Sequence, residues 1–342
     1  MSAQATGPET LGSLSDEPEI NDPNSKQAKE ISGKSPLRIA FGRLVRDKVA
    51  VICALVVLFF VLVAIFAGAI CNLFNVSTET VLASQYLDVL GGGLPKPEYG
   101  PPNGGFTIEH PFGIAPRTAN DNLAWWVFGC RTSLSIAFLA TLIASVTGVV
   151  LGLTAGFLGG AVDRIISFIT DLFMTIPFLL AALTLAPIVS ERFRESPDYA
   201  QVQFYNLIFV LAVFGWMPIA RLIRGEVLSL REREFILSAR VLGMPTGRIL
   251  AKELLPNLVA PIVVTISLML PAFVSAEAGL AYLGIGVTES PSWGQTINQA
   301  VDFFEIYPLY LYEPLLGVVL LVLSLNLLGD AIRDALDPKT RR

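Results

Sequence analysis

The carboxylate Glu277 is the clearest candidate for chemistry in this 342-residue sequence, in which reactive side chains are few. It follows a long apolar run and stands beside Ser275, Gly279 and Tyr282. An ionisable side chain in such apolar sequence commonly marks a pathway, a proton relay or a gate in a membrane protein. The same carboxylate would also fit at an outer membrane interface, where it would cap the end of its helix. Both interpretations of Glu277, gating and capping, stay open from the sequence.

The histidine and the cysteines do not form a catalytic or metal-binding set. His110 is the single histidine, and because a metal site needs several ligands we interpret it as a loop residue with local hydrogen bonds. Cys53 fits a small apolar residue inside a membrane span. Cys71 and Cys130 both fall near the predicted outer face, where either a disulfide or two unpaired small residues would fit.

The sequence argues against an enzyme and against a nucleic-acid-binding protein. Gly33-Lys34-Ser35 resembles the end of an ATP-binding Walker loop, but Ala28 stands where that loop requires glycine, and no HExxH zinc pair occurs. The basic residues lie along predicted membrane edges and are not gathered with aromatic residues on one face. We therefore expect no catalytic residues, no metal site, no cofactor bound by this chain and no nucleic-acid partner. A membrane pore or carrier fits better.

The composition predicts a membrane protein. Hydrophobic residues make up 53% of the chain, charged residues 15%, and the mean hydropathy is +0.61. A helix needs roughly 20 apolar residues to cross about 30 Å of hydrocarbon. We therefore predict an all-α, polytopic membrane protein with six transmembrane helices. The runs that define them are 49–71, 132–162, 172–190, 199–220, 254–276 and a last one that begins near Tyr310.

Three segments outside the main block of spans have their own patterns. Residues 1–35 are polar and lack an apolar period, which predicts a disordered tail. Residues 36–48 combine apolar and basic side chains, which predicts an amphipathic helix in contact with membrane lipid. Residues 72–131 are irregular and rich in Gly and Pro, which predicts a long extracytoplasmic loop rather than a separate domain.

The distribution of basic residues predicts the orientation in the membrane. If the amino terminus is cytoplasmic, all but five of the 24 Lys and Arg residues fall on inner segments. Basic residues favour the cytoplasmic side of a membrane protein. We therefore expect both termini in the cytoplasm. The five residues on outer segments are Lys96, Arg117, Arg131, Arg192 and Arg194.

The second predicted span carries a small residue at every fourth position from Ala140 onward. Small residues at this spacing let helix backbones approach closely within lipid. We therefore predict a helix-packing face rather than a substrate contact. Its glycines are Gly148, Gly152, Gly156 and Gly160.

Asp163, Arg164 and Asp171 follow this span at the predicted inner face. Arg164 stands close enough in sequence to neutralise one of the carboxylates. We therefore interpret the three residues as a polar turn at the membrane interface rather than a proton relay.

A polar interval at residues 234–257, between two apolar runs, has the pattern of a docking surface. Apolar residues at helical spacing alternate in it with small residues that another protein could approach closely. Gly243 is expected to end a first short helix, and Met244-Pro245-Thr246 to begin a second. We predict two short helices joined at a glycine, lying at the membrane surface. The apolar residues are Leu237, Val241 and Leu242, and the small ones are Ser238, Ala239 and Gly243.

This interval resembles the signature of permease subunits of ABC importers. In that signature a Glu-Ala-Ala triplet is followed after three residues by Gly and, ten residues after the Gly, by Ile-x-Leu-Pro. In this chain the triplet positions 237–239 hold Leu-Ser-Ala. The later positions Gly243, Leu255 and Pro256 match the signature, whereas Glu253 replaces the Ile.

Flanking motifs make the chain similar to the second permease of the dipeptide, oligopeptide and nickel importer group. They are His110-Pro-Phe-Gly, Ala281-Tyr-Leu-Gly-Ile-Gly and Asn326-Leu-Leu-Gly-Asp, so that the resemblance covers roughly residues 36–339. After His110-Pro-Phe-Gly the family usually continues Thr-Asp, whereas residues 114–120 here differ. That region faces the binding protein in such importers, which leaves the cargo open.

The resemblance implies a type I ABC importer permease fold in a bacterial inner membrane. Residues 132–339 would form the permease core, with five transmembrane helices and a cytoplasmic coupling loop at 223–256. The implied partners are a second homologous permease, two ATPase subunits that bind ATP and Mg, and an extracytoplasmic substrate-binding protein. The residues implied to couple to the ATPase are Leu237, Ser238, Ala239, Arg240, Gly243 and Met244.

The implied function is ATP-driven import of short peptides by alternating access. The same machine could instead carry nickel chelates, glutathione-like peptides or oligosaccharides. A self-sufficient secondary carrier is less favoured, because the sequence shows no inverted repeat of two halves and does contain a docking interval.

Overall fold

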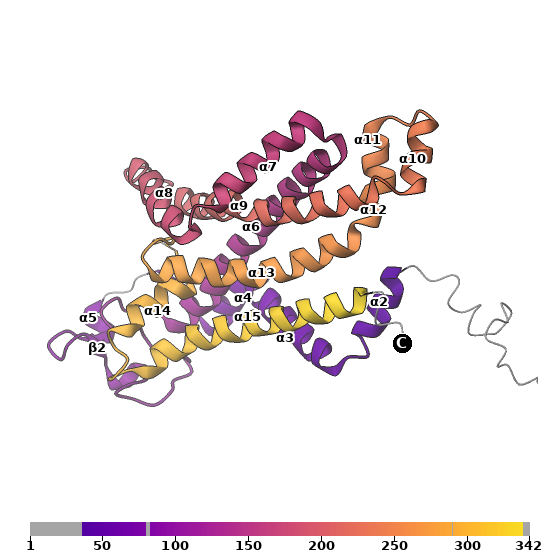
Figure 1. Ribbon diagram of the computed structural model, residues 1–342. Helices are drawn as coiled ribbons and strands as arrows, with labels where there is room; N and C mark the ends of the chain where they lie inside the picture. The colour runs from indigo at the N-terminus through magenta and orange to yellow at the C-terminus, as the bar shows by residue number, and fades with distance from the viewer. Residues whose placement is uncertain (1–35, 80–82, 289, 338–342) are drawn as a thin grey trace, which may run out of the picture.

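The computed structural model describes residues 36–79, 83–288 and 290–337, and this part of the chain is a bundle of long helices (Figure 1). Apolar runs adopt helices in lipid because a helix bonds all its own backbone polar groups. Five helices are long and apolar enough to cross a membrane. They are α3 (Lys48–Ile65), α6 (Asn122–Leu158), α9 (Tyr199–Leu230), α13 (Val259–Tyr282) and α15 (Pro308–Leu336). The predicted tail at 1–35 lies outside the described residues.

A bent pair of helices supplies a sixth candidate span. α7 (Gly160–Met174) and α8 (Phe178–Arg192) meet at an angle of 88°. Pro177 lies at the break, where its ring disfavours a helical conformation for the preceding Ile176. Counted as one span, the pair brings the described chain to the six predicted spans, although the predicted run at 172–190 covers mainly α8.

Short elements connect the spans. α2 (Pro36–Leu44) precedes α3, and α4 (Ala67–Phe74) follows it. The strands β1 (Leu87–Asp88) and β2 (Leu94–Pro95) pair antiparallel, with Leu87 opposite Pro95. The others are α5 (Ala83–Tyr86), η1 (Pro97–Tyr99), α10 (Glu234–Val241), α11 (Thr246–Ile249), η2 (Leu250–Leu254), α12 (Leu255–Asn257) and α14 (Trp293–Val301).

The bundle has two distinct ends. In Figure 1, α10 and α11 lie at one end together with α2 and the last turns of α15, and we name this the α10 end. The opposite end carries α14, α5 and β2, and we name it the α14 end. Both ends of the described chain therefore lie on the side that bears α10.

Two boundaries differ from those read from the sequence. α6 begins at Asn122 rather than near residue 132, because Asp121 caps it by accepting a hydrogen bond from the backbone N–H of Ala124 at 2.8 Å. The predicted first span at 49–71 is divided near Phe66 into α3 and α4. The predicted loop at 72–131 is therefore shorter than expected.

The glycine ladder packs α6 against α9, as predicted for three of its members. A Cβ added to Gly148 or to Gly152 would lie 2.6 Å from the carbonyl oxygen of Trp216 or of Ala220. A Cβ on Gly156 would lie 2.8 Å from the Cβ of Val227. The two backbones therefore touch with no room for side chains.

Gly160 does not belong to this packing face. It opens α7 after Gly159, with positive φ values of 59° and 66°, and no described atom lies within 4 Å of a Cβ added to it. Its role is to let the backbone turn between α6 and α7, since positive φ favours glycine.

Candidate functional site

α10 is anchored to the bundle by its inner face. Ile236 and Ala239 are buried in a cluster with Leu153 of α6 and with Ile223 and Val227 of α9. α10 follows α9 after a short turn, so the apolar cluster folds α10 back against the ends of α6 and α9. A displacement of α10 would therefore act directly on these two long helices.

Gly243 joins α10 to α11 in the predicted way. Its φ is +72°, and its N–H donates to the carbonyl of Arg240 at 3.0 Å while the N–H of Met244 donates to that of Ala239 at 3.0 Å. These bonds satisfy carbonyls at the end of a helix, which is the usual use of a left-handed glycine there. The predicted pair of short helices joined at a glycine is confirmed.

The outer face of α10 is an exposed apolar surface, which we name the α10 surface. It consists of Leu237, Val241 and Leu242, of which Val241 is 87% and Leu242 82% exposed. Contiguous exposed apolar side chains commonly mark a site of protein interaction.

The six residues predicted to couple to an ATPase divide between the two faces of α10. Leu237, Ser238 and Gly243 are exposed. Ala239 is buried and Met244 is partly buried against the apolar cluster. Their coupling role stays a prediction, but Ala239 and Met244 lie on the anchoring side.

Arg240 also anchors α10, although its side chain is exposed. Its guanidinium lies 4.4 Å from the ring centroid of Phe157 in α6. A cation placed over an aromatic face is attracted by the ring's quadrupole. The sequence offered no sign of this contact, because 83 positions (240 − 157) separate the two residues.

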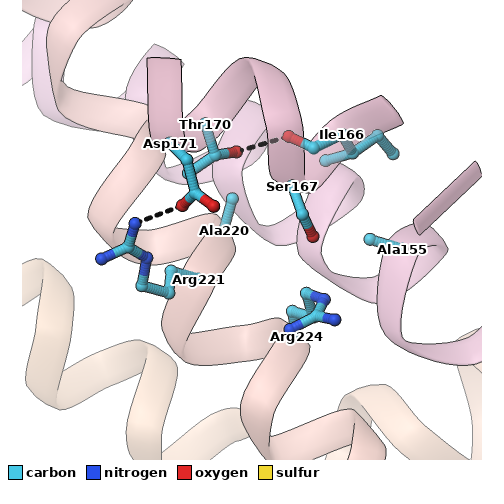
Figure 2. A pocket seen from close by; sticks show the side chains of 8 residues that line it. All are labelled: Ala155, Ile166, Ser167, Thr170, Asp171, Ala220, Arg221 and Arg224. Atoms are coloured by element: carbon cyan, nitrogen blue, oxygen red, sulfur yellow. Dashed lines mark hydrogen bonds and ion pairs between the residues drawn. The ribbon is translucent and has the colours of Figure 1, made fainter. Parts of the chain in front are cut away.

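Two Asp–Arg pairs join α7 to α9 beside a pocket of about 460 Å³. Figure 2 shows this pocket with the Arg221–Asp171 pair and with Arg224 in its lining. Arg224 holds both carboxylate oxygens of Asp163, with Nη2 2.8 Å from Oδ2. Arg221 pairs with Asp171. The prediction that Arg164 neutralises one of these carboxylates is wrong, because both partners come from α9, 61 and 50 residues away along the chain.

A third arginine, Arg231, lies directly after α9 and joins that helix to α6. Arg231 donates from Nη1 to the carbonyl oxygen of Gly156 at 3.1 Å. A cation near the carboxyl end of a helix is favoured by the helix dipole. Together with the apolar cluster, this bond fixes the α10 end of α9 to the end of α6.

Glu277 is fully enclosed at the α14 end, with an exposed fraction of 0%. Ser292 donates its hydroxyl to Oε1 at 3.0 Å, whereas Oε2 accepts no hydrogen bond from the described residues. The hydroxyl of Ser133 in α6 also faces this carboxyl. Glu277 therefore does not cap a helix at a water-facing surface, and its gating role stays a prediction.

Trp293 closes the same region. Its ring is fully buried, and its Nε1 donates to the carbonyl oxygen of Trp126 at 2.9 Å. A Cβ added to Gly129 or to Gly317 would lie 3.0 Å from this ring. The ring thus fills the space where α6, α14 and α15 meet.

The remaining candidates have structural roles. His110 Nδ1 lies 2.7 Å from Oδ2 of Asp121, which confirms a loop histidine with local hydrogen bonds. Cys71 and Cys130 are buried and free, so the unpaired alternative is confirmed for them. Cys53 is likewise buried and free.

Comparison with known proteins shows the family of the chain. Residues 148–342 match the family described as the binding-protein-dependent transport system inner membrane component. Residues 35–79 match the N-terminal transmembrane domain of oligopeptide transport permease C. The first match covers more than half of the sequence.

Relatives along almost the whole chain belong to peptide transport systems. The dipeptide transport permease DppC of Alkalihalophilus pseudofirmus is 32% identical, over 95% of this chain and 96% of that protein. The oligopeptide permease OppC of Bacillus subtilis is 30% identical, over 93% and 95%. The glutathione permease GsiD of Pectobacterium atrosepticum is 31% identical, over 92% and 94%.

A solved structure is also similar. An inward-facing form of the MetNI methionine ABC transporter aligns with 62% of this chain and 96% of that chain, at 22% identity and a TM-score of 0.49. The family match and the helical bundle confirm the predicted all-α, polytopic importer permease fold. The chain belongs to the family of inner-membrane components of binding-protein-dependent ABC importers, in the group of C-type permeases of the dipeptide and oligopeptide systems.

Proposed function

We propose that this chain is the second of two permease subunits in an ATP-driven importer of short peptides. The family membership supports an importer, and the dipeptide and oligopeptide relatives support a peptide cargo. In this proposal the two permeases enclose a shared pathway, an extracytoplasmic binding protein delivers the peptide, and two ATPase subunits bind ATP and Mg. The chain itself is not an enzyme.

The α10 surface is the observation that carries the proposal. A short helix with one buried and one exposed apolar face suits insertion into a groove of another protein. Ile236 and Ala239 hold α10 to the bundle while Val241 and Leu242 stay available to a partner. The ATPase is the proposed partner, because the sequence has no Walker loop of its own and needs an outside source of free energy.

The anchoring of α10 supports a mechanism of coupling. ATP-driven closure of the ATPase subunits would displace α10, and the apolar cluster would pass the displacement to α6 and α9. A bundle with inward-open and outward-open states would then change population as the ATPase cycles. Because packed cores resist continuous deformation, α6 and α9 would move as rigid helices.

The proposed orientation places the α10 end in the cytoplasm of a bacterial cell. The basic residues near α2 and on the 223–256 segment favour that side. Both ends of the described chain lie at the same end of the bundle, which agrees with two cytoplasmic termini.

Retention of the ATPase tests the proposal. We expect Val241→Asp with Leu242→Asp to lose the co-purifying ATPase and peptide uptake, while the chain still inserts in the membrane, because charges on this surface would not enter an apolar groove. Leu90→Asp, at a fully exposed apolar position of the α14 end, is the matched control and should retain the ATPase. An unchanged amount of bound ATPase in the double variant would overturn the proposal, and uptake by the chain alone, driven by an ion gradient, would favour a secondary carrier.

Glutathione-like peptides are a second candidate cargo, favoured by the glutathione permease among the relatives. The choice between cargoes would lie largely with the partner binding protein. Calorimetric titration of that protein with a dipeptide, an oligopeptide and glutathione would separate them, with the tightest binding expected for the dipeptide or the oligopeptide.

A further inference from the structure

We propose that the two Asp–Arg pairs between α7 and α9 are positioning contacts that make α7 move together with α9 and α10. This inference rests on the proposed function, since it concerns how an ATP-driven displacement of α10 would reach the rest of the pathway. It assigns a role to Asp163, Asp171, Arg221 and Arg224, which family membership does not give.

α7 is held loosely compared with the other spans. Thr170 is the single buried residue of this fully described helix. The pocket of about 460 Å³ lies where α7 faces α6 and α9, with Ala155, Ile166 and Ala220 on its apolar side. Where α6 meets α9, by contrast, glycine backbones are in direct contact. Ion pairs therefore bridge α7 and α9 at a place where close packing does not.

Both ends of α7 are joints. At its start, Gly159 and Gly160 have positive φ, and no described atom crowds a Cβ placed on Gly160. At its end, the chain breaks before Pro177 and turns by 88° into α8. A rigid helix between two such joints can change its tilt through few backbone dihedrals, as hinge motions do.

The arginines sit on the helix that leads directly to α10. Arg221 and Arg224 are three residues apart and so share one face of α9. From Arg224 to the end of α9 at Leu230 the rise is about 9 Å at 1.5 Å per residue. A shift of α10 would therefore move both guanidinium groups together with it, and the paired carboxylates of α7 would move with the guanidinium groups.

The two pairs should not contribute equally. In the Arg224–Asp163 pair the side chains are 33% and 20% exposed and the contact is bidentate. In the Arg221–Asp171 pair they are 54% and 65% exposed, with a single contact. Bidentate pairs with less solvent are stronger and more directional. We therefore expect the Asp163–Arg224 pair to contribute more than the Asp171–Arg221 pair to the joint movement of α7 and α9.

Distances between spin labels in the assembled importer test the link. One label pair, Phe168→Cys on α7 with Leu222→Cys on α9, reports whether the two helices stay together. A second pair, Arg248→Cys on α11 with Leu90→Cys at the α14 end, reports whether ATP moves the α10 end. The native cysteines are buried, which limits their labelling. The complex is measured with its ATPase and second permease, without nucleotide and with ATP.

With wild-type charges, we expect the distribution of the Phe168–Leu222 distance to stay narrow with and without ATP. The Arg248–Leu90 distance should change with ATP. In the double variant Asp163→Asn with Arg224→Gln, ATP should still change the Arg248–Leu90 distance. The distribution of the Phe168–Leu222 distance should become at least about twofold broader. The exchange Asp163→Arg with Arg224→Asp should restore much of the narrow distribution, since it keeps opposite charges in contact. Asp302→Asn, which removes the exposed Arg117–Asp302 pair, is the matched control and should change neither distance.

The outcomes separate this inference from the proposed function. If ATP does not change the second distance in the wild-type complex, the proposed coupling through α10 fails. The positioning role of the ion pairs fails if ATP changes the Arg248–Leu90 distance but the Phe168–Leu222 distribution stays narrow in the double variant Asp163→Asn with Arg224→Gln. If the charge exchange behaves like the neutral variants, a structural effect of substitution replaces the electrostatic link.

Discussion

The two ends of the bundle are built from different contacts. At the α14 end, the buried ring of Trp293 and the enclosed Glu277 hold α6, α13 and α14 together. At the α10 end, Arg224 pairs with Asp163 and lines a pocket, and α10 exposes apolar side chains. Buried contacts separate only at a large cost, whereas partly solvated ion pairs can reform at a shifted position. The α14 end is therefore closed by buried side chains, whereas α7 is joined to α9 by partly solvated ion pairs that can separate, next to the close contact of α6 with α9.

The largest effect should come from removing the ring that closes the α14 end. We expect Trp293→Ala to destabilise the folded chain by about 3 to 5 kcal/mol, because it deletes a fully buried aromatic side chain and leaves a cavity. Phe304→Ala, at a substantially exposed position just after α14, is the control and should have a much smaller effect. Thermal unfolding in detergent measures both, and equal losses would contradict a stiff α14 end.

A second test concerns the close contact between α6 and α9. We expect Gly152→Ala to cost about 1 to 3 kcal/mol, because its Cβ would overpack the backbone of α9. Gly225→Ala on α9 meets no described atom within 4 Å and should be neutral or slightly stabilising. The same unfolding measurement checks the pair. Similar stability of the two variants would show that α6 and α9 are not in backbone contact.

Glu277 tests whether shape or charge matters at the α14 end. We expect Glu277→Gln to be nearly neutral, because the amide keeps the shape and an oxygen that accepts from Ser292. Glu277→Ala should cost about 1 to 3 kcal/mol by leaving a buried hydroxyl without its partner. Unfolding midpoints and uptake rates check both variants. If glutamine were as damaging as alanine, the charge of Glu277 rather than its shape would matter.

A smaller and more local effect is expected at the joint after α10. Gly243→Ala should destabilise the joint between α10 and α11 by about 1 to 2 kcal/mol, because a left-handed conformation is unfavourable for alanine. Gly247→Ala is the matched control, since it has equal open space and no positive φ. Hydrogen exchange of α10 and α11 reports the change locally. Unchanged exchange in Gly243→Ala, or equally fast exchange in Gly247→Ala, would contradict the role of the glycine conformation.

Elements that depend on a local pattern could be predicted from the sequence. Apolar length predicts the spans, because a helix in lipid needs no partner to satisfy its backbone. The four-residue period of Gly148, Gly152 and Gly156 predicts close packing, since it puts every glycine on one face. Gly243 between two short amphipathic stretches likewise predicts the joint after α10, because a left-handed cap is a local requirement.

Contacts between residues far apart in the sequence could not be predicted in this way. Asp163 pairs with Arg224 rather than with its neighbour Arg164, because the bend after α6 turns α7 toward α9. Glu277 is enclosed rather than exposed because α14 folds back and brings Ser292 to it. A sequence pattern records the period of a helix but not which face of another helix will lie against it. Helix crossing and loop return set those contacts, and they depend on the packing of the whole bundle.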